Sequence, residues 1–206
     1  MSIICVVKAH DSIVMSADNR CTHTAKDGSK TYDNDFSKLY FLESVGVGIS
    51  SCGDAIINSR PLKKYFEDFE NAELCADKDN IATVAGKLYN NLNKLNVDDS
   101  YHFVCGFFKG EQMVFLVSKE RVQLINDSYS FKGHEIYGFG LEAMYSKSDS
   151  YTLGKALEIA QTIVALTIKG SQVEEEGDPG YNSCGGNVTS LIIEKDSHRW
   201  TQLPLA

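Results

Sequence analysis

The chain has 206 residues, of which 43% are hydrophobic and 23% charged, as in a folded domain rather than a disordered segment. It carries 20 basic and 28 acidic residues, a net charge of −8 with no Lys or Arg run, so we expect no nucleic acid partner. Apolar residues 3–7 are too few for a signal peptide, and no membrane-spanning run of about eighteen apolar residues occurs. We therefore expect one cytoplasmic domain, residues 1–206, that does not enter a membrane.

The cysteines and histidines give no metal-binding pattern. Six cysteines are scattered without a C-x-x-C pair, which is typical of a reducing compartment. The five histidines, including His23 near Cys21, lack the spacing of metal ligands. We expect neither a metal nor another cofactor.

Four apolar runs of strand length precede the first helical pattern. They cover residues 3–7, 13–17, 38–42 and 45–50. Polar residues 8–12 predict a hairpin turn between the first two runs, and polar residues 22–35 predict a loop before the third.

Two helices are predicted next. From Gly53 to Phe69 apolar residues recur at helical spacing, and Pro61 is expected to kink or restart this helix. Residues 81–95 form a more regular helical pattern behind the candidate caps Asp79 and Asn80.

Further strands and a helix are predicted in the second half of the chain. A meander of three strands is predicted, then a helix over residues 153–169, then a strand over residues 187–194 with an edge strand over 200–203. The meander covers residues 101–108, 113–118 and 122–125. The order predicts an α+β fold in which helices cover two packed sheets, a four-layer α/β/β/α sandwich.

Ser2 stands at an unusual position for a chemically useful residue. Methionine before serine is normally removed, which would leave Ser2 as the first residue, at the start of a predicted strand. Its α-amine, with an ordinary pKa of about 7.7–8.0, could then accept the proton of its own hydroxyl. The alternative is a frayed terminal serine without a role, as at most chain ends.

Three early segments resemble proteasome β subunits, members of the N-terminal-nucleophile (Ntn) hydrolase family. Residues 2–20 resemble the family's opening, with Asp18 and Arg20 at its acidic residue and arginine. Lys38 occupies the place of the family lysine. Ser50, in the glycine-rich turn of residues 48–55, falls at the position whose backbone N–H binds the oxyanion.

Two later segments extend the resemblance over nearly the whole chain. Residues 137–140, followed by a helix, and residues 184–195, which begin with Cys184, are similar to the family's closing glycine turn and strand. The resemblance implies the sandwich fold, an acyl-enzyme on Ser2, and supporting roles for Arg20 and Cys184.

The charges implied by the resemblance have a physical logic. A lysine beside the Ser2 amine would lower the pKa of that amine and leave it a usable base. Asp18 would hold Lys38 charged and oriented. An oxyanion N–H at Ser50 would contribute about 2.7–4 kcal/mol to the transition state. The alternative for Asp18 and Lys38 is a purely structural ion pair.

Three positions depart from the pattern of active family members. Phe139 stands where they carry a serine between two glycines, and Tyr181 and Cys184 stand where they carry an aspartate and a serine. These side chains normally surround the nucleophile's amine. Asp178 is a candidate substitute.

The sequence therefore predicts a serine- or threonine-type N-terminal-nucleophile peptidase that acts on peptides or unfolded polypeptide. The resemblance implies a homo-oligomeric ring, with an ATP-dependent unfoldase as a possible partner. Two alternatives stay open: a catalytically silent structural ring subunit of the same fold, and an amidase that acts on a small molecule.

Overall fold

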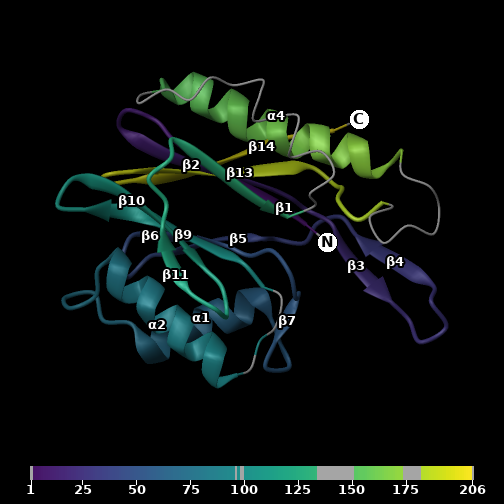
Figure 1. The fold of residues 1–206 in the computed structure, drawn as a ribbon, viewed down its shortest axis with the longest axis horizontal. Helices are drawn as coiled ribbons and strands as arrows, with labels where there is room; N and C mark the ends of the chain where they lie inside the picture. The colour runs from purple at the N-terminus through teal and green to yellow at the C-terminus, as the bar shows by residue number, and fades with distance from the viewer. Residues whose placement is uncertain (1, 96, 98–99, 134–150, 174–181, 206) are drawn as a thin grey trace.

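The computed structural model describes residues 2–95, 97, 100–133, 151–173 and 182–205 (Figure 1). Within these ranges it contains two five-stranded antiparallel sheets, two small hairpins and three helices. The structure thus confirms the α+β class.

The first sheet has the strand order β12-β1-β2-β13-β14. Its central strands pair antiparallel, with Ile4 opposite Ala17, so that the start of β1 lies beside the end of β2. The strands are β1 (Ile3–Lys8), β2 (Ser12–Asp18), β12 (Tyr129–Gly133), β13 (Val188–Glu194) and β14 (His198–Leu203).

The second sheet has the order β11-β10-β9-β6-β5. Its strands are β5 (Leu39–Leu42), β6 (Val47–Ser50), β9 (His102–Phe108), β10 (Glu111–Val117) and β11 (Val122–Leu124). Strands β9 to β11 are the predicted meander, which the structure confirms.

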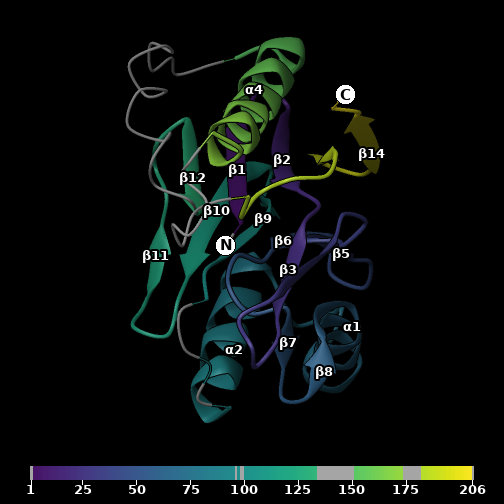
Figure 2. The same ribbon diagram turned by 90° about the vertical axis from the view of Figure 1, so that its right-hand side faces the viewer.

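Helices cover the outer faces of the two sheets (Figures 1 and 2). Helix α4 (Leu153–Ser171) packs on β1 and β2, whereas α1 (Leu62–Glu73) and α2 (Ile81–Lys94) pack on the second sheet. The inner faces of the sheets meet in an apolar core that includes Met15, Phe103 and Leu191.

Strand β1 explains why the N-terminal sequence is apolar without interruption. Successive side chains of a strand point to opposite faces. Ile3, Cys5 and Val7 belong to the core under α4, whereas Ile4 and Val6 belong to the core between the sheets. Both faces are buried, so no polar residue alternates with the apolar ones.

The prediction that a helix begins near Gly53 is wrong. Residues Ile56–Ile57 (β7) and Arg60–Pro61 (β8) form a tight hairpin, and α1 begins only after Pro61. Asn58 and Ser59 at its tip have φ of 51° and 59°, a left-handed turn that a helical pattern does not reveal. Of the two roles predicted for Pro61, the structure shows the start of a helix and not a kink, because α1 begins at the next residue.

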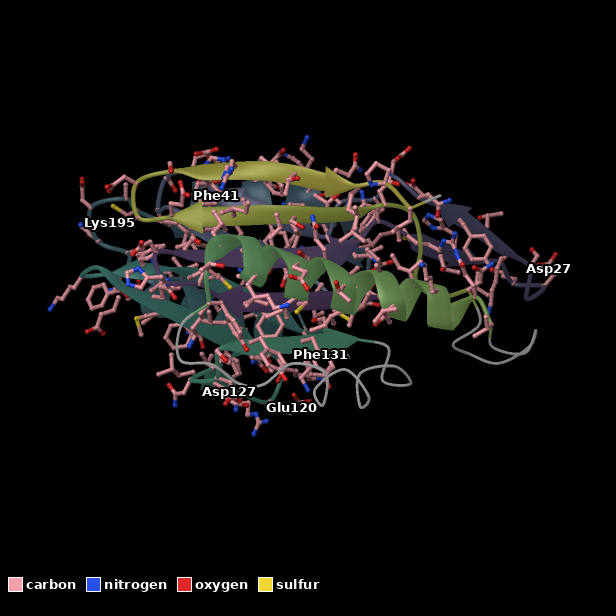
Figure 3. The ribbon with its side chains drawn as sticks, turned by 90° about the horizontal axis from the view of Figure 1, so that it is seen from above. Asp27, Phe41, Glu120, Asp127, Phe131 and Lys195 are labelled. Carbon is pink, nitrogen blue, oxygen red and sulfur yellow. The ribbon has the colours of Figure 1, made fainter. Side chains whose placement is uncertain are left out.

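The loop predicted for residues 22–35 is also partly wrong. Strands β3 (Cys21–Thr24) and β4 (Lys30–Asp33) form a hairpin. Its tip, marked by Asp27, lies at the opposite end of the molecule from Lys195 in the β13–β14 turn (Figure 3). Most of its side chains are exposed, and therefore no apolar alternation marked these strands.

The cap predicted at Asn80 is confirmed. Its Oδ1 accepts hydrogen bonds from the backbone N–H groups of Ala82 and Thr83, and Thr83 Oγ1 accepts one from the Asn80 N–H. This reciprocal capping box satisfies donors that the first turn of a helix leaves free. Asp79 instead accepts from the Cys75 N–H and pairs with Lys87.

Within the described ranges, no helix has both the length and the apolar composition that a membrane-spanning segment requires.

We predict that Gly133→Ala destabilises the fold by at least about 2 kcal/mol. A Cβ at residue 133 would overlap the Ser2 carbonyl oxygen and lie 2.8 Å from the Ile3 Cα. The backbone of Gly133 also has a φ of 139°, which residues with a side chain rarely adopt. Urea unfolding measures the change. The matched control is Gly86→Ala in the middle of α2, where the new methyl group would meet no atom within 4 Å beyond its chain neighbours and the backbone of its own helix. It should stabilise the fold by about 0.5–1 kcal/mol. Equal effects of the two variants would contradict this packing.

His102 predicts how stability depends on pH. The imidazole is fully buried, and its Nε2 lies 3.1 Å from Ser100 Oγ. Burial lowers its pKa to about 4, whereas an unfolded histidine titrates near 6.5. The unfolded chain therefore binds more protons between these values. The stability that the neutral His102 contributes is fully present above about pH 6.5. The free energy of unfolding falls by about 3 kcal/mol from this residue as the pH decreases toward 4.

Unfolding of the wild type and of His102→Gln across pH 4–7 tests this expectation. The variant should lose less stability than the wild type as the pH falls. Parallel curves for the two proteins would contradict a buried neutral imidazole.

Candidate active site

Ser2 lies at the entry to β1 and is 5% exposed. Its carbonyl oxygen accepts a weak hydrogen bond from Cys52 Sγ at 3.6 Å. On the other side Ile3 pairs with Gly133 of β12, whose lack of a side chain allows the backbone to approach Ser2. The start of the chain is therefore packed on both sides, unlike an ordinary frayed terminus.

Asp18 is the last residue of β2 and is fully buried. Its Oδ1 accepts hydrogen bonds from the Ile3 N–H at 2.9 Å and from Lys38 Nζ at 2.7 Å. Its Oδ2 accepts from the backbone N–H groups of Gly185 at 3.1 Å and of Arg20 at 3.3 Å. These four donors stabilise the buried carboxylate.

Lys38 precedes β5 and brings its charge to the same place. The residue is 4% exposed, and its ammonium forms an ion pair with Asp18. Its carbonyl oxygen accepts from the Ser51 N–H at 2.8 Å, which links it to the end of β6. A buried pair of this kind is fixed in place, because separating the charges would leave each one unpaired in a medium of low polarity.

Ser50 is the last residue of β6, and its hydroxyl accepts from the Phe103 N–H at 3.1 Å. The Ser50 side chain thus binds the neighbouring strand β9 and not Ser2. Two residues later Cys52 reaches the Ser2 carbonyl. The turn after Ser50 therefore passes directly beside the start of the chain.

Arg20 and Cys184 lie behind Asp18. The guanidinium Nη1 is 3.4 Å from the Cys184 carbonyl oxygen and 2.6 Å from Asn182 Oδ1. Burial and the nearby Asp18 carboxylate raise the pKa of the Cys184 thiol to about 12. Burial also raises the pKa of Cys52 to about 11. Both thiols are neutral near pH 7, when a thiol is a poor nucleophile.

The structure thus brings Asp18 and Lys38 together next to Ile3, the residue after Ser2. Arg20 binds Asp18 through its backbone N–H and the Cys184 carbonyl through its guanidinium. The candidate positions Phe139, Asp178 and Tyr181 lie outside the described residues. Reasoning from sequence did not single out Gly133, Cys52 or Asn182 as neighbours. No strand is predicted over residues 129–133, so nothing in the sequence marks Gly133 as the end of β12. The other contacts arise between residues far apart in the chain.

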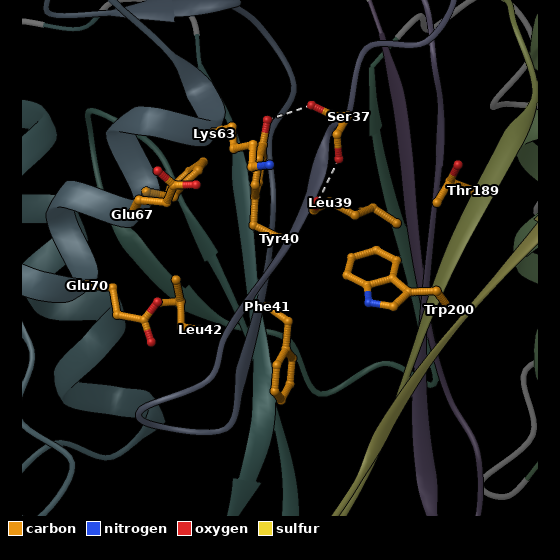
Figure 4. A pocket seen from close by; sticks show the side chains of 11 residues that line it. Ser37, Leu39, Tyr40, Phe41, Leu42, Lys63, Glu67, Glu70, Thr189 and Trp200 are labelled. Carbon is orange, nitrogen blue, oxygen red and sulfur yellow. Dashed lines mark hydrogen bonds between the residues drawn. The ribbon is translucent and has the colours of Figure 1, made fainter.

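A pocket of about 390 Å³ lies elsewhere, between α1, β5 and the edge strand β14 (Figure 4). Its lining includes Leu39, Phe41, Glu70 and Trp200, but not Ser2, Asp18 or Lys38. Figure 4 shows the Trp200 ring close to the Leu39 side chain. The pocket is therefore separate from the candidate active site. No group of three or more potential metal ligands occurs in the described part of the chain.

The geometry can serve base-assisted nucleophilic chemistry. The buried Asp18 carboxylate binds both the Ile3 N–H and the Lys38 ammonium group. A positive charge held near the first residue favours the neutral form of that residue's amine. The amine and the hydroxyl of Ser2 would then be base and nucleophile in one residue.

Comparisons with known proteins identify the fold but not a family. A scan against models of protein families finds none that matches, and a search of curated proteins finds no relative. Among solved structures, the chain is similar to the "Anbu (Gly-1) mutant from Hyphomicrobium sp. strain MC1", with a TM-score of 0.76 and 15% sequence identity. The match covers 99% of this chain and 87% of that one. At this identity the likeness concerns the fold alone.

We predict that Asp18→Asn destabilises the protein by about 3–5 kcal/mol, because it leaves the buried Lys38 ammonium without its counter-charge. Chemical unfolding at pH 7 measures the loss. The matched control is Glu158→Gln, which weakens an exposed pair with Lys155 on α4 and should change stability by less than about 1 kcal/mol. An Asp18→Asn variant as stable as the control would contradict the buried pair.

Proposed function

We propose that this chain is an N-terminal-nucleophile peptidase that cleaves peptide bonds through an acyl-enzyme on Ser2. The observation that carries this proposal is the buried Asp18–Lys38 pair, whose carboxylate also binds the Ile3 N–H directly after Ser2. The fold likeness to Anbu, a protein with the proteasome-like Ntn-hydrolase fold, supports it.

In the proposed mechanism, removal of Met1 frees the Ser2 amine. The neutral amine accepts the hydroxyl proton, directly or through water, while Oγ attacks the carbonyl carbon of the substrate. The tetrahedral intermediate collapses as the proton passes to the leaving nitrogen, and an ester on Ser2 remains. Water, activated by the same amine, hydrolyses this ester and restores Ser2.

Each supporting residue has a proposed role in this cycle. Lys38 holds a positive charge near the amine and lowers the pKa of that amine, and Asp18 orients Lys38. We assign the oxyanion donor to the backbone N–H of Ser50, because Cys52, two residues later, contacts the Ser2 carbonyl. The N–H groups of Ser51 and Cys52 already donate to backbone carbonyl oxygens. Arg20 supports Asp18 through its backbone N–H, and Cys184 accepts a hydrogen bond from the Arg20 guanidinium.

The assembly follows the same proposal. We infer a single domain with the four-layer α/β/β/α sandwich, in a homo-oligomeric ring in the cytoplasm that admits peptides or unfolded polypeptide. An ATP-dependent unfoldase is a candidate partner of such a ring. The similarity in fold supports the sandwich, whereas ring formation depends on the surfaces of the subunit.

A catalytically silent ring subunit is the second candidate function. It is favoured by Cys184, which stands where active members of the resembled family carry serine and which is a neutral, fully buried thiol. In that case Asp18 and Lys38 would serve stability alone. A small-molecule amidase is the remaining alternative, and a monomeric or dimeric mass on size exclusion would favour it.

Covalent labelling tests the peptidase proposal. We predict that a β-lactone reactive toward serine and threonine forms one adduct, located on Ser2 by peptide mass spectrometry, and that Ser2→Ala forms none. Lys38→Met should label about 10²–10⁴-fold more slowly, because the base is then protonated and the nucleophile is not activated. The exposed Lys64→Met is the matched control and should label at the wild-type rate.

The alternatives give different results in the same assay. Equal labelling of wild type and Ser2→Ala would contradict Ser2 as the nucleophile. A folded wild type that forms no adduct would favour the structural subunit.

A further inference from the structure

Arg20 joins three segments that are distant in sequence. Its Nε donates to Asn34 Oδ1 at 2.8 Å, in the segment that leads to Lys38. Its Nη1 donates to Asn182 Oδ1 at 2.6 Å and to the Asn182 carbonyl at 3.1 Å. The guanidinium also lies 4.8 Å from the centre of the Tyr32 ring, on β4.

The position of this guanidinium is coupled to the Asp18 carboxylate through Gly185. The Gly185 N–H donates to Asp18 Oδ2, and a Cβ at residue 185 would overlap the Arg20 guanidinium. Gly185 is thus packed directly between the guanidinium and the carboxylate. The Arg20 guanidinium therefore bounds one side of the space in which the Gly185 N–H donates to Asp18.

Asn182 is itself held firmly. Its backbone N–H donates to the Ser171 carbonyl at the end of α4 at 2.7 Å, and its φ is 55°. Asparagine tolerates this left-handed conformation better than most residues. Both its carbonyl and its side-chain oxygen then face the same Arg20 nitrogen. Asn182 is the point at which α4 fixes Arg20.

We infer that Asn182 is a positioning residue for the reaction proposed at Ser2. It holds Arg20, Arg20 confines Gly185, and Gly185 fixes one oxygen of Asp18 while the other oxygen binds Lys38. Asn182 thereby sets the charge that faces the Ser2 amine without touching the substrate. The inference rests on the proposed function for its chemical consequence, but the anchoring of Arg20 can be measured separately.

Two substitutions separate the side-chain hydrogen bond from the backbone conformation. Asn182→Gly keeps the left-handed backbone and the carbonyl but removes Oδ1. Asn182→Asp keeps an acceptor oxygen at the same place, so it is expected to keep Arg20 anchored as in the wild type. Neither variant places a new bulky side chain in the turn.

The first readout is modification of Arg20 by phenylglyoxal, followed by peptide mass spectrometry. We expect Arg20 in Asn182→Gly to react about tenfold faster than in the wild type, the effect of losing one hydrogen bond to a charged group. Asn182→Asp should react at the wild-type rate. Arg60, an exposed arginine, is the internal control and should react equally in all three proteins. An unchanged rate at Arg20 in Asn182→Gly would overturn the inference.

The second readout is the pH dependence of β-lactone labelling at Ser2. In Asn182→Gly the acidic limb should shift to higher pH, because a loosened Lys38 lowers the pKa of the Ser2 amine less. Asn182→Asp should restore the wild-type profile. An unshifted limb in Asn182→Gly, with faster Arg20 modification, would overturn the positioning role and leave a structural anchor.

The two proposals fail in distinguishable ways. A wild type that forms no adduct at Ser2 would contradict the proposed function and, with it, the catalytic consequence assigned to Asn182. The phenylglyoxal rates would still decide whether Asn182 anchors Arg20.

Discussion

The arrangement around Ser2 depends on one buried carboxylate. Asp18 has no exposed surface and binds the Ile3 N–H, Lys38 Nζ and the N–H groups of Arg20 and Gly185. Because an unpaired charge in the interior is costly, each of these donors must stay in place for the fold to be stable. The first strand, the lysine segment and the turn before β13 are therefore held at one point, where the start of the chain lies.

The same constraint connects stability with the proposed chemistry. A charge near the Ser2 amine is useful only if it cannot turn away into water, and burial of Lys38 against Asp18 prevents such movement. Gly133 and Cys52 then limit where Ser2 itself can lie. A preorganised site of this kind carries its cost in the folded state rather than during the reaction.

Prediction from sequence succeeded where burial leaves a clear apolar pattern, either continuous or with helical spacing. Strand β1 and helix α2 have one clear apolar pattern each, and both occur as expected. It failed where local chemistry competes with pattern: Ile56 and Ile57 looked helical, but the Asn58–Ser59 turn makes a hairpin. The exposed hairpin β3–β4 has no apolar alternation from which its strands could be predicted.

The candidate site was predictable in part for a related reason. Asp18 and Lys38 could be proposed from a resemblance in motif and order, and the structure places them in contact. The contact between Arg20 and Asn182 spans 162 positions in the chain. It depends on how α4 ends against the first sheet, a tertiary relation that no local spacing encodes.

The central claim is that the buried pair faces a free Ser2 amine. The most direct test is the intact mass of the protein expressed with its natural start and purified without a tag, supported by sequencing of its first residues. The account predicts a mass that lacks Met1 and a sequence that begins Ser-Ile-Ile. A chain that retains Met1 throughout would have no amine on Ser2 and would contradict the proposed mechanism.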